Sequence, residues 1–377
     1  MIPTSLYIHI PWCVRKCPYC DFNSHKRPDT LPEEQYIQAL LEDFSNDLRQ
    51  YQPQEIHTIF IGGGTPSLMS GESYAELLHR LQQLVAFSPD IEITMEANPG
   101  TMEQQRFKEY RQAGINRLSL GIQSFNAGHL KALGRIHDDL QAHRAIEMAR
   151  WAGFDNINLD IMHGLPGQSV QGGIDDLQTA LAHHPEHLSW YQLTLEPNTV
   201  FYRQRPSLPS EDITCDMEEK GFALLAKHGY ERYEISAFCQ PGRAARHNLN
   251  YWLFGDYFGI GAGAHGKLSP DKDTVFRTRK HRQPQKYLAP EQPFLIEREK
   301  IGQGSLAFEF MLNTTRLEQV IPYTLFPART GLPLQVIQAR LEQAAATGLI
   351  SLREKGWQIT ELGRRYTNDL QTLFLPE

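Results

Sequence analysis

The regular alternation of six β-favouring stretches with helical segments constrains the fold of this chain most. The stretches cover residues 5–11, 57–61, 91–96, 117–123, 156–161 and 187–193. Between them, apolar residues recur at helical spacing, as at 31–51, 70–85, 138–152 and 170–182. This order predicts an α/β fold with a parallel sheet and right-handed crossovers, either open or curled into a partial barrel. No G-x-G-x-x-G sequence follows the first strand, which argues against a Rossmann dinucleotide site.

Three of the five cysteines lie within eight residues, in the loop that follows the first predicted strand. Cys13, Cys17 and Cys20 have C-x3-C-x2-C spacing, and no fourth cysteine follows closely. Each of three thiolates on one loop can bind one iron of a four-iron cluster. The fourth iron would then be open to a substrate or cofactor, like the open position of catalytic metal sites.

Two other uses of these thiols have to be compared with the cluster. A structural zinc site would need His9 or His25 as its fourth ligand, but such sites usually contain two ligand pairs, and the chain has no second pair. A disulfide leaves one thiol over, and nothing in the sequence marks a secreted protein. The spacing therefore favours the cluster.

Polar residues and glycines collect at the predicted carboxyl ends of successive strands. Residues 62–65 (Gly-Gly-Gly-Thr), Glu96, Gln123 and Asp160 all have this position. In barrels built from parallel strands, this end carries the active site. Turns at the strand ends explain the glycines. Side-chain packing does not explain why acids and amides also collect at this rim. We therefore predict a site at this rim, next to the cysteine loop.

The chain divides into three predicted parts: a barrel of residues 1–235, a connecting segment of residues 236–300, and a C-terminal module of residues 301–377. A helix, two short strands and a closing helix in the last part indicate a winged-helix-like α+β module. From Gly331 to Glu377, five basic and five acidic residues cancel, which is unfavourable for phosphate contacts. We therefore interpret the module as packing or substrate cover rather than as a DNA-binding unit.

Composition excludes several classes of protein. The net charge of −7 argues against general nucleic-acid binding. No window holds eighteen consecutive apolar residues, so no membrane span is expected. The first residues lack a basic stretch leading into a long apolar core, so no signal peptide is expected. These features predict a cytoplasmic protein with reduced cysteines.

The motifs resemble those of the radical S-adenosyl-L-methionine (SAM) family. The cysteine loop followed by Gly-Gly-Gly-Thr-Pro at 62–66 is similar to that family as a whole. Tyr-x-His-Ile-Pro-x-Cys at 7–13 and Gly-Ile-Gln-Ser-Phe at 121–125 narrow the resemblance to the branch of the oxygen-independent coproporphyrinogen III oxidase. The resemblance covers nearly the whole chain and implies a partial (β/α)6 barrel.

The resemblance also implies cofactors and their ligands. A [4Fe–4S] cluster would be bound by Cys13, Cys17 and Cys20, with SAM on the fourth iron. Gln123 would contact SAM or face a second ligand, as its counterpart does in the oxidase. The positions that match SAM contacts are Tyr7, Gly63, Gly64, Thr65, Glu96, Gln123, Arg135 and Asp160.

The chemistry of SAM agrees with these positions. A glycine-rich strand end lets the backbone approach the methionine amino group. Glu96 or Asp160 can bind the ribose hydroxyls, and Arg135 can pair with the carboxylate. Without the resemblance, Arg135 would be interpreted as half of a surface salt bridge.

Two features favour the haem chaperones of this branch over the oxidase. The oxidase has another cysteine two residues beyond its cluster motif, where this chain has Phe22, and His-Asn-x-x-Tyr-Trp at 247–252 matches the motif of the haem-binding group. The resemblance thus implies a chaperone that binds haem through His247 and delivers it to respiratory haem proteins. The alternative is a radical SAM oxidase and decarboxylase acting on coproporphyrinogen III.

Other residues would complete such a haem site. Tyr251 and Trp252 would stack on the porphyrin, and a basic loop from Arg277 to Lys286 would contact the propionates or an anionic membrane. A homodimer is implied by the resemblance alone. Thus the expected cofactors are the cluster, SAM and haem, and the expected partners are haem and the proteins that receive it, with no nucleic acid.

Overall fold

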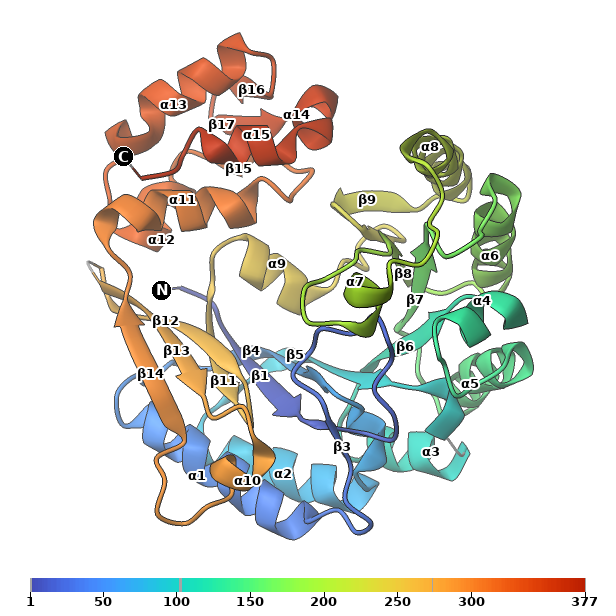
Figure 1. Ribbon diagram of the computed structural model, residues 1–377. Helices are drawn as coiled ribbons and strands as arrows, with labels where there is room; N and C mark the ends of the chain where they lie inside the picture. Colours follow the sequence, from blue (N-terminus) through green and yellow to red (C-terminus); the bar gives the residue numbers. More distant parts are fainter. Residues whose placement is uncertain (1, 102–103, 273, 377) are drawn as a thin grey trace.

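The computed structural model describes residues 2–101, 104–272 and 274–376. Its centre is a curved sheet (Figure 1). Six strands run parallel to their neighbours: β1 (Thr4–Ile10), β4 (Ile56–Gly63), β5 (Phe87–Ala97), β6 (Arg117–Gln123), β7 (Ile157–His163) and β8 (His187–Gln192). The predicted α/β barrel of parallel strands is confirmed.

Helices cover the outer side of this curved sheet (Figure 1). The longest covering helix is α8 (Glu211–Lys227). Two short helices, α4 (Ala127–Ala132) and α7 (Val200–Gln204), come between longer ones in the chain. The apolar sides of the covering helices pack on a core in which strand residues such as Leu6, Ile8 and Leu120 are fully buried. The covering helices are α1 (Glu33–Leu48), α2 (Gly71–Leu84), α3 (Gln104–Gln112), α5 (Asp139–Trp151), α6 (Val170–Ala182) and α8 (Glu211–Lys227).

The sheet continues beyond the six parallel strands at both edges. At one edge, β10 (Ala237–Cys239) pairs antiparallel with β8, and β9 (Glu231–Glu234) pairs antiparallel with β10. At the other, β11 (Asp256–Ile260) pairs parallel with β1 and leads into an antiparallel series: β12 (His265–Asp271), β13 (Thr274–Lys280) and β14 (Leu295–Lys300). The 12-stranded order is β14-β13-β12-β11-β1-β4-β5-β6-β7-β8-β10-β9.

Residues 236–300 are therefore more than the connecting segment that we expected, because most of their strands extend the main sheet. Part of the expected basic loop is strand β13. Lys280 at its end is buried, and its ammonium group lies 2.9 Å from the Asp47 carboxylate and also pairs with Asp43 in α1. Tyr287, in α10 (Pro284–Tyr287), donates a hydrogen bond to Asp43 at 2.7 Å. These buried contacts attach the added strands to the barrel.

The C-terminal module has a second core, in which Phe310, Phe326 and Trp357 are buried together with Phe254 and Val275 from outside the module. Its three-stranded sheet with flanking helices agrees with the expected α+β module. Arg316 pairs with Glu234 of β9 at 3.3 Å and so ties the module to the sheet edge. Its elements are α11 (Gln303–Thr314), β15 (Ile321–Pro322), α12 (Leu325–Thr330), α13 (Gln335–Ala346), β16 (Ile350–Arg353), β17 (Gly356–Ile359), α14 (Glu361–Arg365) and α15 (Thr367–Thr372).

No helix among the described residues is both long enough and apolar enough to cross a membrane.

Candidate functional site

The cysteine loop is closed by a short parallel pair of strands, β2 (Trp12–Cys13) and β3 (His25–Lys26). The backbone N–H of Thr65 donates to the Trp12 carbonyl at 2.7 Å, which attaches the loop to the end of β4. Gly64 is required there, because a Cβ atom would lie 2.5 Å from the same Trp12 carbonyl oxygen. The three loop cysteines are partly exposed and line one cavity of about 560 Å³, which we call the cysteine cavity.

Polar groups contact two of the three sulfurs. The Thr65 hydroxyl donates to the Cys13 sulfur at 3.4 Å, and the Arg135 guanidinium donates to the Cys17 sulfur at 3.8 Å. Burial raises the pKa of the Cys13 and Cys20 thiols. A bound cation would reverse this shift, because coordination removes the thiol proton. The loop therefore presents three thiols that suit a metal cluster.

The zinc alternative finds no support in the positions of the histidines. His9 uses both ring nitrogens in hydrogen bonds of 2.8 Å, to the Tyr7 hydroxyl and to the Asn23 carbonyl. The Nε2 atom of His25 is hydrogen-bonded to the Arg282 carbonyl at 3.0 Å. In the part of the chain that the structure describes, no three His, Cys, Asp or Glu side chains are grouped to hold a single ion. Three separated thiols instead match a cluster, in which each binds its own iron.

Most of the residues predicted at the rim line the cysteine cavity together with the thiols. They come from β4, β5, β6 and β7 and from the turn after α4, so the predicted gathering at the carboxyl ends of the strands is observed. The predicted residues in this cavity are Gly63, Gly64, Thr65, Glu96, Gln123, Arg135 and Asp160.

Glu96 and Asp160 place two carboxyl groups in this cavity. Glu96 accepts a hydrogen bond from the Gly63 N–H at 3.0 Å. Burial, and secondarily the charge of Asp160, raise the pKa of Glu96 to about 8. Burial also raises the pKa of Asp160, although Ser119 donates to its carboxylate at 2.8 Å. A cationic ligand would be attracted to this pair, because it would restore the charged carboxylates.

Arg135 forms no salt bridge with any residue that the structure describes. Its Nη2 atom donates to the Asn98 side-chain oxygen at 2.6 Å and to the Gly121 carbonyl at 2.7 Å. Its Nε atom is buried and has no hydrogen-bond partner among the described residues. One donor of the guanidinium thus remains for a ligand in the cavity. Asn98 was not identified as a site residue from the sequence, although it lies in the turn after the predicted strand 91–96.

Gln123 has an unusual backbone for a non-glycine residue, with φ +70° at the end of β6. Such a conformation costs of order 1–3 kcal/mol and is common at functional sites. Its side-chain oxygen accepts a hydrogen bond from the Tyr191 hydroxyl at 2.8 Å. Tyr191 also lines the cavity, and only its place at the end of the sixth predicted strand could have indicated this.

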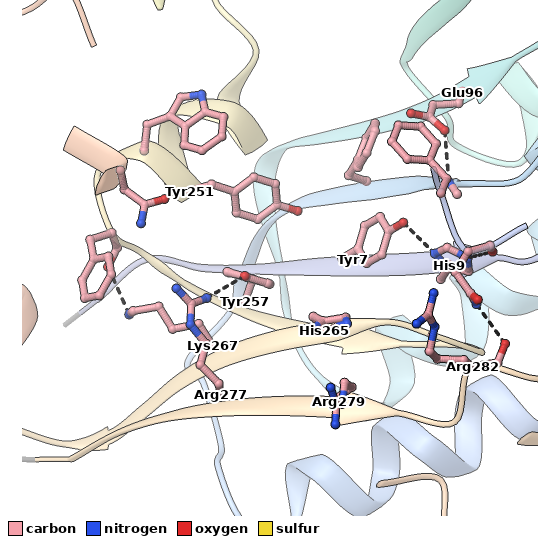
Figure 2. Close-up of a pocket in the computed structure, with 18 residues that line it drawn as sticks. Tyr7, His9, Glu96, Tyr251, Tyr257, His265, Lys267, Arg277, Arg279 and Arg282 are labelled. Carbon is pink, nitrogen blue, oxygen red and sulfur yellow. Dashed lines mark hydrogen bonds between the residues drawn. The ribbon is translucent and has the colours of Figure 1, made fainter. Parts of the chain in front are cut away.

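A second cavity, of about 630 Å³, adjoins the first. We call it the outer cavity (Figure 2). Phe22, Gly63 and Glu96 line both cavities and form their shared wall. Tyr7, predicted to contact SAM, lines the outer cavity instead, where it stacks on Phe60 with ring centroids 5.9 Å apart. Its side chain points there because alternate residues of β1 face opposite sides of the sheet.

Aromatic and basic side chains dominate the outer cavity. Tyr251 and Trp252 of the predicted haem motif line it, as expected. Of the expected basic residues, Arg277, Arg279 and Arg282 line it (Figure 2). Further lining residues, which the sequence did not indicate, are Tyr257, His265 and Lys267.

His247, the expected haem ligand, lines neither cavity. It lies in α9 (Arg246–Trp252) with 4% of its surface exposed. Its ring stacks on Phe60 with centroids 4.4 Å apart, and its Nδ1 atom lies 3.1 Å from the Glu92 carboxylate. Burial lowers the pKa of His247. In this conformation the imidazole is a buried connection between α9 and the barrel, away from both cavities, and its role as a haem ligand stays a prediction.

Comparison with known proteins identifies the family. The model of the radical SAM superfamily matches residues 7–179, and that of the HemN C-terminal domain matches residues 305–366. Heme chaperone HemW of Escherichia coli is 48% identical over 375 residues, which cover 100% of this chain and 99% of that protein. Heme chaperone HemW of Bacillus subtilis is 34% identical over 383 residues, with 99% of each chain covered.

A solved structure shows the same fold. The coproporphyrinogen III oxidase HemN of Escherichia coli superposes with a TM-score of 0.82 and 23% identity, covering 99% of this chain and 90% of that one. Full-length identity to the chaperones, the two matching domains and the shared fold all agree. The chain therefore belongs to the HemW family of the radical SAM superfamily.

Proposed function

We propose that this chain is a haem chaperone, which binds haem and delivers it to respiratory haem proteins. The outer cavity is the observation that carries the proposal. Its volume of about 630 Å³ is typical of a small-molecule site. Aromatic side chains suit a flat apolar ring, and guanidinium groups suit carboxylates such as propionates. The name of the relatives, heme chaperone, supports the same ligand.

The proposal includes a [4Fe–4S] cluster on Cys13, Cys17 and Cys20, and SAM beside it. When bound, the cluster and SAM supply one-electron chemistry. The chain contributes a loop that presents three thiols to one cavity. Glu96 and Asp160 attract the cationic and hydroxyl groups of SAM. The free Nε donor of Arg135 suits its carboxylate.

Phe22, two residues beyond the cluster motif, favours the chaperone over the alternative, an oxidase and decarboxylase of coproporphyrinogen III. Phe22 occupies the position at which the oxidase carries another cysteine, and 55% of its surface is exposed at the wall between the cavities. An apolar ring at this wall can contact a flat ligand but cannot supply a thiol. The structural match to the oxidase, at 23% identity, shows the fold alone.

An anaerobic assay separates the two functions. The reconstituted protein is incubated with coproporphyrinogen III, SAM and a reductant, and Cys17→Ala serves as the cluster-free control. In parallel, the haem-loaded protein is mixed with an apo-cytochrome. We expect transfer of haem and no sustained conversion of the porphyrinogen. Repeated turnover to protoporphyrinogen, absent in the Cys17→Ala control, would refute the chaperone proposal.

A cytoplasmic location, a homodimer and contact of the basic residues with an anionic membrane stay predictions. We still interpret the C-terminal module as a unit that packs on the barrel or covers the substrate. Its attachment to β9 through Arg316 and Glu234 supports this interpretation.

A further inference from the structure

We propose that His265, and not His247, is the axial ligand of haem iron in the outer cavity, and that Arg279 and Arg282 receive the propionates. This inference rests on the proposed function, because it takes haem as the ligand. It adds the iron ligand, the residues that meet the carboxylates and the position of the ring.

The sheet places His265 on the cavity face. In β12, His265 and Lys267 are separated by one residue and therefore share a face of the strand. Their register partners in β13 are Arg279 and Arg277, respectively. All four residues line the outer cavity (Figure 2). A row of one imidazole and three cations thus forms one side of the cavity, but Lys267 and Arg277 are already paired with Asp256 and Glu309.

The His265 imidazole is available to a metal. It makes no hydrogen bond with any residue that the structure describes, whereas the other lining histidine, His9, has both ring nitrogens occupied. His265 is exposed to the cavity, and partial desolvation, followed by the charges of Arg279 and Arg282, lowers its pKa. The neutral imidazole, which is the form that ligates metals, is therefore favoured.

The charges around His265 suit a ligand with carboxylates. The Arg282 guanidinium has no ion-pair partner among the described residues. Arg279 pairs with Glu297 at 2.5 Å, but 45% of each side chain is exposed, so water or a ligand can compete for the pair. Glu96 is the one acid that lines this cavity, and with a pKa of about 8 it is mostly neutral at pH 7. In the SAM-free protein, the protonated Glu96 therefore does not oppose an anionic ligand.

The α9 side of the cavity carries two polar groups that lack partners. The Tyr251 hydroxyl and the Trp252 indole N–H are buried, and neither has a hydrogen-bond partner among the described residues. Buried polar groups are normally hydrogen-bonded, so both indicate a missing ligand or water. Figure 2 shows Tyr251 on the opposite side of the cavity from His265. A porphyrin between these two sides would have His265 at its iron and Tyr251 on its other face.

The test is a titration of the full-length, cluster-reconstituted protein with ferric protoporphyrin IX, followed by the Soret band and by electron paramagnetic resonance. We expect His265→Ala to lose the histidine-type iron signal and about tenfold or more of haem affinity, because removal of even an outer partner of a metal ligand costs 10–100-fold. Added imidazole should restore the signal. A purely structural role of His265 would not produce such a rescue.

Two controls accompany this variant. His281→Ala removes a histidine that does not line the cavity, and His247→Asn tests the motif histidine. Both should keep the iron–histidine signal, and circular dichroism with iron analysis checks that all variants fold and carry the cluster. An unchanged signal in His265→Ala, or its loss in His247→Asn, would overturn the assignment. If the wild-type protein bound no haem, the proposed function itself would fail.

The propionate contact has a separate readout. Arg282→Gln should weaken binding of ferric protoporphyrin IX but leave binding of its dimethyl ester unchanged, because the ester has no carboxylate to pair. Equal losses for both ligands would contradict the role of Arg282, while the histidine signal would still report on His265.

Discussion

Replacement of Glu96 by glutamine tests the electrostatics of the wall between the two cavities. The carboxyl group lies between the cysteine cavity and the outer cavity, and its pKa is raised from 4.5 to about 8, mainly by burial. Folding therefore favours the protonated acid. As the pH rises, Glu96 ionises in the unfolded chain at about pH 4.5, before it ionises in the folded protein. Between about pH 4.5 and pH 8, Glu96 therefore destabilises the folded protein by an increasing amount. Above pH 8 this destabilisation is constant.

The change in the free energy of unfolding follows from the shift in the Glu96 pKa, because each pKa unit corresponds to 1.36 kcal/mol. The destabilisation by Glu96 is about 2 kcal/mol at pH 6 and about 5 kcal/mol at pH 9. Glutamine does not titrate, and its side-chain oxygen can still accept from the Gly63 N–H. The stability of Glu96→Gln relative to the wild type should therefore rise by about 3 kcal/mol between these two pH values.

Thermal unfolding of the SAM-free protein at pH 6 and pH 9 measures this difference. An unfolding entropy of about 2.1 cal/mol/K per residue, over 377 residues, converts it to a relative gain in Tm of about 4 °C. Comparing two pH values cancels any effect of the substitution that does not depend on pH. Asp90→Asn is the control, because an exposed aspartate has finished titrating below pH 6. If the difference in Tm between the variant and the wild type stayed constant from pH 6 to pH 9, the conclusion that Glu96 is buried and neutral would be refuted.

Three further predictions concern the cluster and the packing of the barrel. Alanine at each of the three loop cysteines should abolish the iron content and brown colour after anaerobic reconstitution, and retention of four irons would contradict the ligand assignment. Lys280→Met should cost about 3–5 kcal/mol of unfolding free energy, because it leaves two buried aspartates unpaired, whereas the exposed Lys286→Met should change little in a thermal melt. Gly221→Ala should cost about 1–3 kcal/mol, because its Cβ would lie 2.0 Å from the Trp190 ring; Gly172→Ala, whose Cβ would make only ordinary contacts at 3.5 Å or more, is the control in the same melt.

The parallel half of the sheet could be predicted because its strands are buried on both faces and therefore form apolar runs. The strands β11 to β13 were not recognised, because they carry polar residues on the face that lines the outer cavity, as at His265 and Arg277. A run of basic residues then resembles a loop. Only the pairing of β11 with β1 shows that this segment belongs to the sheet.

The positions of the site residues could be predicted where the strands of the sheet determine them. Gly64 and Asp160 lie where the alternation of strands and helices placed them, and the backbone alone brings them to one cavity. The direction of a side chain on a helix depends on what the helix packs against. His247 belongs to the motif that indicated haem, but α9 turns it toward Glu92 and presents Tyr251 to the cavity instead.

The wall shared by the two cavities connects the cysteine loop to the frame of the outer cavity. The wall consists of Phe22 from the cysteine loop, Gly63 from β4 and Glu96 from β5. Asn23, next to Phe22, donates hydrogen bonds of 2.9 Å to the carbonyls of Ala262 and Arg282, so the end of the cysteine loop is attached to the frame of the outer cavity. A change in the residue at position 22 therefore alters the lining of both cavities while the barrel and its cluster loop stay the same.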